Sequence, residues 1–484
     1  MGETVKRFGN LIGGASVPAA SGETIEVRNP ATGELAARVA RSDRADVDRA
    51  VRAADRSFAS WAGTSAKERA LLLHRAADRV RENLEPISRL LTTEMGKPLQ
   101  DSRKEVQHGA EVLDFFAEEG LRVGGEVAPV GLPQVTSLVL REPIGVCAAI
   151  APWNYPVSLI AWKVGPALAT GCTLVAKPAS ETPTAALEYL RAVHEAGLPD
   201  GVVNAVTGPG SVVGMALVEH PLVRKIAFTG TVSIGREIMA RAAATLKRVS
   251  LELGGQSPLI VCADADFGAA VKAGVQRAFR NMGQICNAVN RIFVEAPIYA
   301  DYLDAFAEES RKLTIGDGLR NPTVDLGPML NQAGIEKAIR HIEDALGKGA
   351  RLLCGGKHPE GPEYQTQLYF EPTGLADCTL EMLVMREETF GPVVGIAPFQ
   401  GIEEGVRLAN STDFGLVSYA YTGSLAKARA LALGIQSGTV CINNIVGSTL
   451  EAPYPGWKQS GMGLELSRHA LGEYLLVKHV RIEV

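Results

Sequence analysis

The first region of the chain has the apolar spacing of one-faced helices. Apolar residues recur three and four positions apart, which brings them to one side of a helix but to both sides of a strand. The first such run contains Val47, Val51, Ala54, Phe58 and Trp61. Similar patterns continue to about Glu119, so the sequence predicts a helical N-terminal region.

Glycine and proline then interrupt the helical pattern. Gly124-Gly125, Pro129, Gly131 and Pro133 precede the apolar run from Val135 to Leu140, which predicts an extended hairpin leaving the globular body. At the other end, Leu475 to Val484 begins as an apolar run and then alternates like a strand. An exposed strand needs a partner for its free edge.

Between Pro143 and Glu252, short apolar runs alternate with helix-like segments. This alternation is typical of a parallel, doubly wound sheet. The expected strands are 145–150, 173–176, 202–206, 225–228 and 248–251, and the expected helices begin near Tyr155, Thr182, Gly210 and Val232. A second α/β block is expected from Ser257 to about Asn443.

Composition supports a globular α/β protein of two or three domains. The chain has 484 residues, of which 46% are hydrophobic and 21% charged. A net charge of −5 argues against nucleic acid as the main partner. Lys163 interrupts the longest apolar run, and the start Met1 to Lys6 lacks the apolar core of a signal peptide. We therefore expect a cytoplasmic protein without a membrane segment.

The cysteines and histidines show neither disulfide nor metal spacing. Seven cysteines form an odd set without a C-x-x-C pair, which argues for a reducing compartment. The eight histidines are scattered, so no metal is predicted. A single cysteine is most often a small buried hydrophobe. That interpretation fits Cys147, Cys172, Cys262, Cys354, Cys378 and Cys441, which mostly lie in apolar or strand-like runs.

Cys286 differs because it ends a polar, glycine-bearing segment that begins at Phe279. A cysteine thiolate adds to an aldehyde carbon, and the resulting thiohemiacetal can expel hydride if a nicotinamide lies alongside. The product is a thioester that water must cleave. Glu252 stands between Leu251 and Leu253. Desolvation there would raise its pKa toward the range in which it can take a proton from water.

Two strand ends offer features of a dinucleotide site. Phe228 to Gly235 has the pattern of a strand, a glycine turn and a helix start, where backbone N–H groups face an anion. It is not a G-x-G-x-x-G fingerprint, and glycines in such turns are often only turn residues. Lys177 closes another strand, where it could bind ribose hydroxyls or phosphate, although lysines at strand ends are more often solvated.

Seven segments jointly carry a resemblance over nearly the whole chain. The segments are Pro152-Trp153-Asn154-Tyr155-Pro156, Lys177-Pro178-Ala179-Ser180, Phe228-Thr229-Gly230, Leu251-Glu252-Leu253-Gly254-Gly255, Gly283-Gln284-Ile285-Cys286, Glu388-Thr389-Phe390-Gly391-Pro392 and Lys458-Gln459-Ser460-Gly461. In this order, they resemble the NAD(P)-dependent aldehyde dehydrogenase superfamily, and in particular succinate-semialdehyde dehydrogenases.

The resemblance implies two doubly wound, Rossmann-like α/β domains and a β-hairpin oligomerisation element. The dinucleotide-binding domain would comprise residues 1–124 and 144–252, and the catalytic domain residues 253–454. Residues 125–143 and 470–484 would form the oligomerisation element, which pairs subunits into a homodimer or homotetramer. Sequence does not choose between these two assemblies.

The resemblance also assigns the site residues. Cys286 would be the nucleophile and Glu252 the general base. Asn154 would donate to the oxyanion together with the Cys286 backbone N–H. Without the resemblance, Asn154 would be interpreted as a turn residue. An NAD or NADP site would be formed by Trp153, Lys177, Ser180, Gly230, Thr231, Glu388 and Phe390. Lys177 and Glu388 would hold the riboses, and Gly230 with Thr231 the pyrophosphate.

Two departures from the family pattern affect the choice between NAD and NADP and the loop near the substrate entrance. NAD-specific members usually have a glutamate where this chain has Ser180, and a small hydroxyl side chain admits the 2′-phosphate of NADP. Glu181 would work against NADP if it pointed inward. Pro455 stands where the family commonly has glycine, and its fixed φ predicts a different loop near the substrate entrance.

The substrate pocket is predicted to be mixed. Arg280 lies six residues before Cys286, where succinate-semialdehyde dehydrogenases hold a distal carboxylate, and a guanidinium pairs with carboxylate through two parallel hydrogen bonds. Trp162 resembles the broad-specificity branch, and Tyr155 adds a second aromatic wall. Arg280 could instead pair with a surface acid. We expect a short semialdehyde, with a plain aliphatic or aromatic aldehyde as the alternative.

Other functions fit less well. A CoA-acylating relative would share Cys286 and Asn154 but tend to lack Glu252. A related acyl-phosphate reductase would need a phosphate-handling site that is not evident. A catalytically retired binding or structural homologue would have lost one of the three residues, and all three are present.

Overall fold

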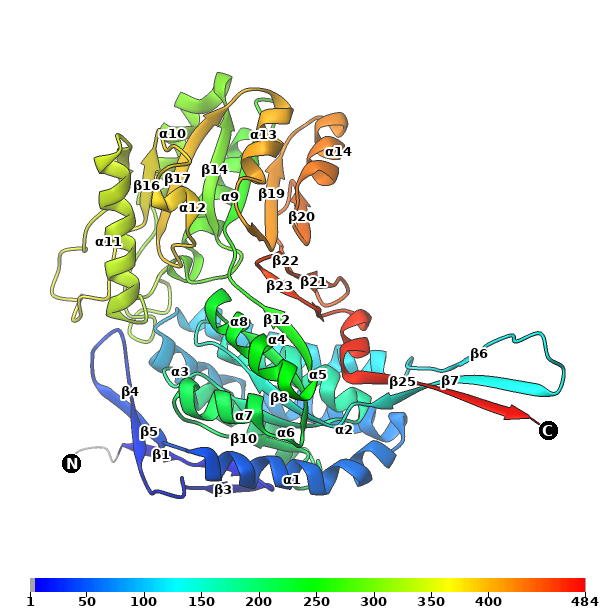
Figure 1. Cartoon of the computed structure of the whole chain (residues 1–484). Helices are drawn as coiled ribbons and strands as arrows, with labels where there is room; N and C mark the ends of the chain where they lie inside the picture. Colours follow the sequence, from blue (N-terminus) through cyan, green and yellow to red (C-terminus); the bar gives the residue numbers. More distant parts are fainter. Residues whose placement is uncertain (1–4, 484) are drawn as a thin grey trace.

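The computed structural model describes residues 5–483 (Figure 1). Met1 to Thr4, within the predicted dinucleotide-binding domain, and Val484, at the end of the predicted C-terminal strand, lie outside the described residues. Figure 1 shows two α/β bodies, one above the other, and a long hairpin that projects from the lower body beside the C-terminal strand.

Helices dominate the N-terminal region, as predicted. Asp43 caps the first helix: its side chain accepts from the backbone N–H groups of Ala45 and Asp46, and the Asp46 side chain accepts in return from the Asp43 N–H. Val47, Val51, Ala54 and Trp61 are buried. The helices are α1 (Arg44–Gly63), α2 (Ala66–Glu82), α3 (Leu84–Met95) and α4 (Leu99–Gly120).

The first large sheet has the predicted doubly wound core. Its five central strands are parallel in the order β12-β11-β8-β9-β10, so the chain winds outward in both directions from β8. A ligand crevice forms where such a winding reverses, here between β8 and β11. The strands are β8 (Val146–Ile150), β9 (Thr173–Lys177), β10 (Val203–Ala205), β11 (Val223–Thr229) and β12 (Arg248–Glu252), with β23 (Gly461–Met462), β2 (Asn10–Ile12) and β3 (Ala15–Val17) at the edges.

The helices that connect these strands begin close to the predicted positions. They are α5 (Pro156–Thr170), α6 (Thr184–Glu195), α7 (Met215–Glu219) and α8 (Val232–Ala242), and a single π-helical turn, Gly210–Gly214, precedes α7. All residues of α5 are buried, including Lys163.

The second large sheet contains seven strands in the order β15-β16-β17-β14-β13-β19-β20. Only the edge strand β15 runs antiparallel to its neighbour. The strands are β13 (Ser257–Val261), β14 (Val289–Glu295), β15 (Arg351–Cys354), β16 (Thr373–Ala376), β17 (Val393–Phe399), β19 (Val417–Tyr421) and β20 (Thr439–Ile442). The helices are α9 (Phe267–Phe279), α10 (Tyr299–Arg311), α11 (Gln332–Gly347), α12 (Leu383–Arg386), α13 (Gly401–Ala409) and α14 (Leu425–Gly434).

Smaller sheets complete the fold. In the projecting hairpin, β6 (Glu126–Val127) and β25 (Leu475–Glu483) both pair antiparallel with β7 (Val135–Pro143). The remaining strands are β1 (Lys6–Phe8), β4 (Thr24–Arg28), β5 (Leu35–Ala40), β18 (Phe414–Gly415), β21 (Tyr454–Pro455), β22 (Trp457–Lys458) and β24 (Leu464–Glu465). The predicted fold class is confirmed. Within residues 5–483, no helix has the length and apolar character needed to cross a bilayer.

Candidate active site

A tight loop between α9 and β14 presents Cys286. Asn281, Met282 and Gly283 all have left-handed φ angles, of 52°, 58° and 68°. A Cβ on Gly283 would lie 2.2 Å from the carbonyl oxygen of Gly391, so a larger residue does not fit there. The Gln284 side chain accepts a hydrogen bond from the Leu330 N–H at 3.0 Å. These constraints fix the backbone just before the thiol.

Cys286 is the half-buried cysteine, and the other six are buried, as predicted. All seven are free thiols. Burial, followed by the nearby charge of Glu252, raises the pKa of the Cys286 thiol well above its usual range. Burial and Glu252 therefore both oppose formation of the attacking thiolate.

Glu252 ends β12 as an almost unsolvated carboxyl group. Its side chain is 2% exposed, and neither carboxyl oxygen has a hydrogen-bond partner among residues 5–483. Burial, with the repulsion of Glu465 next, raises its pKa to about 8. A carboxyl group with this pKa can exchange a proton near neutral pH.

Lys163 and Glu465 form a buried pair behind Glu252, which the sequence analysis missed. The Lys163 ammonium donates to Glu465 Oε1 and to Thr229 Oγ1, both at 2.7 Å. Its positive charge counteracts part of the rise in the Glu252 pKa. Lys163 had been noted only because it interrupts an apolar run. A buried lysine needs a buried partner for its charge. The position of Lys163 within a long apolar run was the signal in the sequence that could have indicated such a pair.

Asn154 follows β8 and lies in the same region. It is 3% exposed, its Nδ2 donates to the Gln284 carbonyl at 3.0 Å, and its Oδ1 has no partner in the described part of the chain. Lys97 donates to the Asn154 carbonyl at 2.7 Å and to Glu105 at 2.6 Å, which holds this segment in place. One Nδ2 hydrogen is left for a further acceptor.

One cavity of about 230 Å³ contains the sulfur and all three predicted substrate residues. Arg280, Trp162 and Tyr155 line it together with Cys286 and Asn154. It is also lined by residues that the sequence analysis did not select, among them His108, Arg277, Asn287, Ser448 and Tyr454.

Aromatic contacts fix the walls of this cavity. The Trp162 indole N–H donates to His108 Nε2 at 3.1 Å, and the Trp162 and Tyr454 rings meet edge to face at 5.5 Å. The Lys97 ammonium lies 3.7 Å from the centre of the Tyr155 ring. Arg280 is less constrained, since its side chain is 37% exposed and its only ion-pair contact in residues 5–483 is with Asp101 at 3.9 Å.

The end of β11 leads directly into the start of helix α8. The Gly230 N–H donates to the Glu252 carbonyl at 3.0 Å, and Thr231 is the N-cap residue of α8. No side chain caps this helix start in the described residues. The first N–H groups of α8 therefore stay available to an external acceptor, and the helix dipole favours an anion there.

Lys177 is the last residue of β9, and Ser180 follows three positions later. Lys177 is 5% exposed, and burial lowers its pKa to about 8. No acid forms an ion pair with it in the part of the chain that the structure describes. The Ser180 hydroxyl donates to the Gly208 carbonyl at 2.8 Å, and Glu181 is exposed. A buried, unpaired ammonium fits a hydroxyl or phosphate ligand.

Glu388, Phe390 and Trp153 form the third part of the predicted cofactor site. The Gly255 N–H donates to Glu388 Oε1 at 2.9 Å, and burial raises the Glu388 pKa to about 7. A Cβ on Gly254 would lie 2.6 Å from Glu388 Oε2. Phe390 has a left-handed φ of 54°, and its ring meets Trp153 edge to face at 5.4 Å. The predicted cofactor residues thus lie at or just after the ends of β8, β9 and β11, and in the segment of Glu388 that contacts Gly255.

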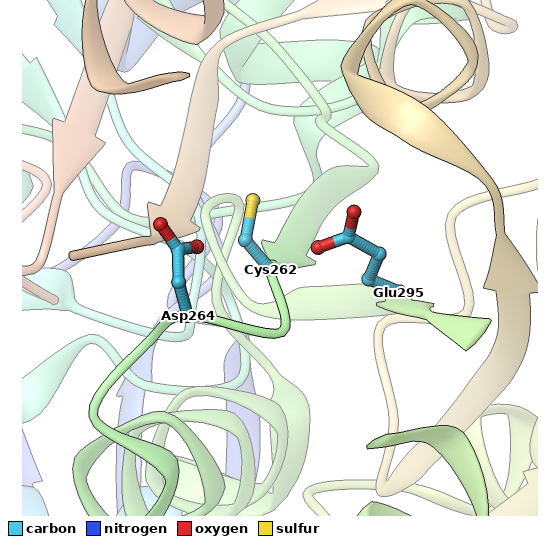
Figure 2. A group of neighbouring side chains, drawn as sticks. All are labelled: Cys262, Asp264 and Glu295. Carbon is cyan, nitrogen blue, oxygen red and sulfur yellow. The ribbon is translucent and has the colours of Figure 1, made fainter. Parts of the chain in front are cut away.

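A separate group of possible metal ligands lies in contact with a lysine. Figure 2 shows Cys262, Asp264 and Glu295, whose ligand atoms lie within 4.8 Å of one another. The Lys427 ammonium contacts Asp264 at 3.3 Å and Glu295 at 3.1 Å, and Thr422 donates to Asp264. One lysine thus forms ion pairs with both acids. The predicted lack of a metal stays a prediction.

The comparisons with known proteins agree with this geometry. Residues 17–480 match the model described as "Aldehyde dehydrogenase family". The chain is 42% identical over 473 residues to a glutarate-semialdehyde dehydrogenase of Pseudomonas putida, covering 98% of this chain and 97% of the relative. It is 41% identical to a succinate-semialdehyde dehydrogenase [NADP(+)] of Escherichia coli K12, with the same coverage.

A solved structure extends the comparison to three dimensions. Betaine aldehyde dehydrogenase from Staphylococcus aureus in complex with NAD⁺ superimposes with a TM-score of 0.95 at 34% identity, covering 98% of this chain and 94% of that one. The predicted superfamily and an NAD(P)-dependent oxidoreductase acting on aldehydes are thereby confirmed. The chain belongs to the aldehyde dehydrogenase family.

Proposed function

We propose that this protein oxidises a short semialdehyde, an aldehyde with a carboxylate at its other end, to the dicarboxylate with NAD⁺ or NADP⁺. The observation that carries the proposal is the shared cavity of Cys286 and Arg280. Within residues 5–483, the Arg280 guanidinium has a single ion-pair contact, with Asp101 at 3.9 Å. The semialdehyde dehydrogenases among the relatives support the same substrate class.

In this proposal, Cys286 and Asn154 act on the aldehyde carbon. The thiolate adds to the carbonyl and forms a thiohemiacetal, while the Asn154 amide and the Cys286 backbone N–H donate to the oxygen that becomes negative. Bound NAD(P)⁺ supplies the acceptor for the hydride that leaves this carbon, and a thioester on Cys286 results.

Glu252 would complete the turnover. Its carboxylate takes a proton from water, the hydroxide attacks the thioester carbon, and the Cys286 sulfur leaves while the acid is released. The pKa of about 8 places Glu252 close to the range where it can both accept and release that proton. The buried pair of Lys163 and Glu465 adjusts this pKa.

The cofactor would be held by the strand ends of residues 1–124 and 144–252, the proposed dinucleotide-binding domain. Lys177 and Glu388 would bind the riboses, and Gly230 with Thr231 the pyrophosphate at the start of α8. Trp153 and Phe390 would lie beside the nicotinamide. The unpaired Lys177 ammonium and the uncapped α8 terminus support this assignment. Residues 253–454 would be the catalytic domain.

Ser180 favours a site that accepts both cofactors. It brings no charge against a 2′-phosphate, and Glu181, the acid that could repel one, is exposed to solvent. We therefore propose that NADP⁺ is used at least as readily as NAD⁺.

We further propose a homo-oligomeric, cytoplasmic enzyme. Strand β25 pairs with β7 along one side, and its outer residues Leu476, Val477 and Ile482 are 43%, 61% and 45% exposed. A second subunit would cover this edge. Residues 125–143 and 470–484 would then form the oligomerisation element that the sequence analysis predicted. Seven free thiols fit a reducing compartment.

A second candidate is oxidation of plain aliphatic or aromatic aldehydes, which the aromatic walls Trp162 and Tyr155 favour. Reduced-nicotinamide formation with succinate semialdehyde, propanal and benzaldehyde, each with NAD⁺ and with NADP⁺, separates the two. The proposal expects the highest kcat/KM for the semialdehyde, and an Arg280→Ala variant that raises KM mainly for this substrate. Higher kcat/KM for propanal or benzaldehyde would favour the second candidate.

A further inference from the structure

Arg277 is a buried guanidinium in the wall of the cavity that holds the Cys286 sulfur. It lies in the last turn of α9, three residues before Arg280, and is 7% exposed. Residues three apart on a helix lie on neighbouring parts of its surface. The two arginines therefore face the same cavity from one helix end, Arg280 near solvent and Arg277 in the interior.

The hydrogen-bonding capacity of Arg277 is largely unused. Nη2 donates to the backbone carbonyl of Asn287 at 3.0 Å and to the side-chain oxygen of the same residue. Its guanidinium carbon lies 5.4 Å from the centre of the Tyr419 ring. Nε is buried without a partner, and no acid forms an ion pair with Arg277 in residues 5–483. A guanidinium has five N–H donors, so this environment leaves most of them free.

Arg291 is a buried arginine with a structural role, and it shows how this protein provides hydrogen-bond acceptors for such a guanidinium. It is 1% exposed and also lacks an acidic partner in the described part of the chain. Its Nε, like that of Arg277, has no partner in residues 5–483, but its two terminal nitrogens donate to the backbone carbonyls of Leu408, Gln256 and Ala409 and to the hydroxyls of Ser411 and Thr412. Arg291 also does not line the cavity. The poor satisfaction of Arg277 is therefore not a general feature of buried arginines here.

The acids of the cavity wall already have cationic partners. Glu105 is paired with the buried Lys97 at 2.6 Å. Asp101 lies 3.4 Å from Lys104 and 3.9 Å from Arg280. Neither acid is left for Arg277. A buried cation without an anion is costly, and the cost falls when a bound anion supplies the missing charge.

We propose that Arg277 is a second cationic ligand for the distal acid group of the substrate, acting together with Arg280, and that it determines the preference for aldehydes that carry an anion. This inference rests on the proposed semialdehyde function. Two guanidinium groups offer parallel donor pairs to the two oxygens of one carboxylate. Trp162 and Tyr155 then shape the space between the aldehyde carbon and the acid group without contributing charge.

The test compares succinate semialdehyde with butanal, a neutral aldehyde of the same carbon number, in Arg277→Met and the parent enzyme. Hydrogen bonds to a charged group are worth enough for at least a tenfold effect. We expect the ratio of kcat/KM for semialdehyde to kcat/KM for butanal to fall at least tenfold, mainly through KM. Arg277→Lys keeps the charge and should restore part of the ratio. Arg320→Met, an exposed arginine of the same domain, is the matched control.

Equal losses for both aldehydes in Arg277→Met would overturn the inference and assign Arg277 to support of the fold. A parent enzyme without preference for the semialdehyde would instead refute the proposed function itself. Should Arg277→Met fail to fold, inhibition by succinate tests whether Arg277 binds the distal acid group. We expect succinate to compete with the aldehyde and to inhibit Arg277→Lys at least tenfold more weakly than the parent. Unchanged inhibition by succinate would overturn the inference.

Discussion

The hydroxyl oxygen of Tyr454 lies 3.7 Å from the sulfur of Cys286 and accepts a hydrogen bond from Asn287 Nδ2 at 3.0 Å. Because the amide donates to this oxygen, the hydroxyl hydrogen is free to point toward the sulfur. Burial and Glu252 raise the Cys286 pKa, and the Tyr454 contact lowers it. Tyr454 thus opposes the two effects that keep the thiol protonated.

Tyr454→Phe should make the thiolate harder to form. Loss of the hydroxyl removes a stabilising hydrogen bond to the thiolate, so alkylation of Cys286 should slow about tenfold at neutral pH. The measurement is the rate of iodoacetamide inactivation against pH, with the midpoint expected to move to higher pH. Tyr189→Phe, a buried tyrosine bonded to the Gly109 carbonyl, serves as the control. An unchanged pH profile in Tyr454→Phe would exclude this role.

Asn154→Ala should lower kcat by about 10²–10³-fold, the usual cost of losing one oxyanion donor. The KM for the cofactor should change little, because the missing amide faces the Cys286 cavity. Steady-state kinetics with saturating cofactor provide the measurement. A decrease smaller than about fivefold would show that the backbone N–H of Cys286 suffices and that Asn154 is structural.

Glu252 should make stability depend on pH in an identifiable window. Its folded-state pKa of about 8 lies above the ordinary value of 4.5, so the folded protein holds a proton that the unfolded chain releases between these values. Stability from this group is complete below pH 4.5 and declines as the pH rises toward 8. Glu252→Gln removes the decline, so its Tm advantage over the parent should grow by about 2 °C or more between pH 5.5 and 8.5.

Thermal unfolding at the two pH values tests this directly. Glu360→Gln removes an exposed carboxyl group and provides the control. A Tm difference between Glu252→Gln and the parent that is the same at both pH values would mean that Glu252 is already ionised in the folded state.

Ser180→Glu should convert the site toward NAD⁺. A carboxylate at this position would repel the 2′-phosphate of NADP⁺ and accept a hydrogen bond from the 2′-hydroxyl of NAD⁺. We expect kcat/KM for NADP⁺ to fall about 100-fold and kcat/KM for NAD⁺ to hold or rise. Ser180→Ala is the matched control, because it removes the hydroxyl without adding charge. Equal changes for both cofactors would place the adenosine ribose away from residue 180.

The fold was largely predictable because its signals are local and repeated. The spacing from Val47 to Trp61 marked α1, and the apolar runs between Pro143 and Glu252 marked the five parallel strands within a few residues. Boundaries were less exact: the strand expected at 202–206 occupies Val203–Ala205, and the helix expected near Gly210 begins with a π-helical turn. The exact ends of helices and strands depend on tertiary contacts, which the local pattern of apolar and polar residues does not contain.

From the residues alone, without the family resemblance, the site was predictable where a residue stood out from its surroundings. Cys286 and Glu252 did so, one in a polar glycine loop and the other between two leucines. Tyr454 and Glu465 did not, because each reaches the site only through a neighbour far away in sequence, and Arg277 did not, because nothing in its local sequence marks it as buried. Tyr454, for example, reaches Cys286 across 168 positions. The rise in the Glu252 pKa through desolvation was predicted from its two leucine neighbours, whereas the opposing effects of Glu465 and Lys163 on this pKa became apparent only in the structure.

The most direct test of the account is the intact mass of Glu252→Gln quenched seconds after mixing with succinate semialdehyde and cofactor. If Cys286 forms a thioester that Glu252-activated water cleaves, one acyl group should accumulate on Cys286 alongside a burst of reduced nicotinamide, and neither should appear with Cys286→Ala. Turnover of Glu252→Gln at the parent rate without an acyl adduct would contradict the central claim.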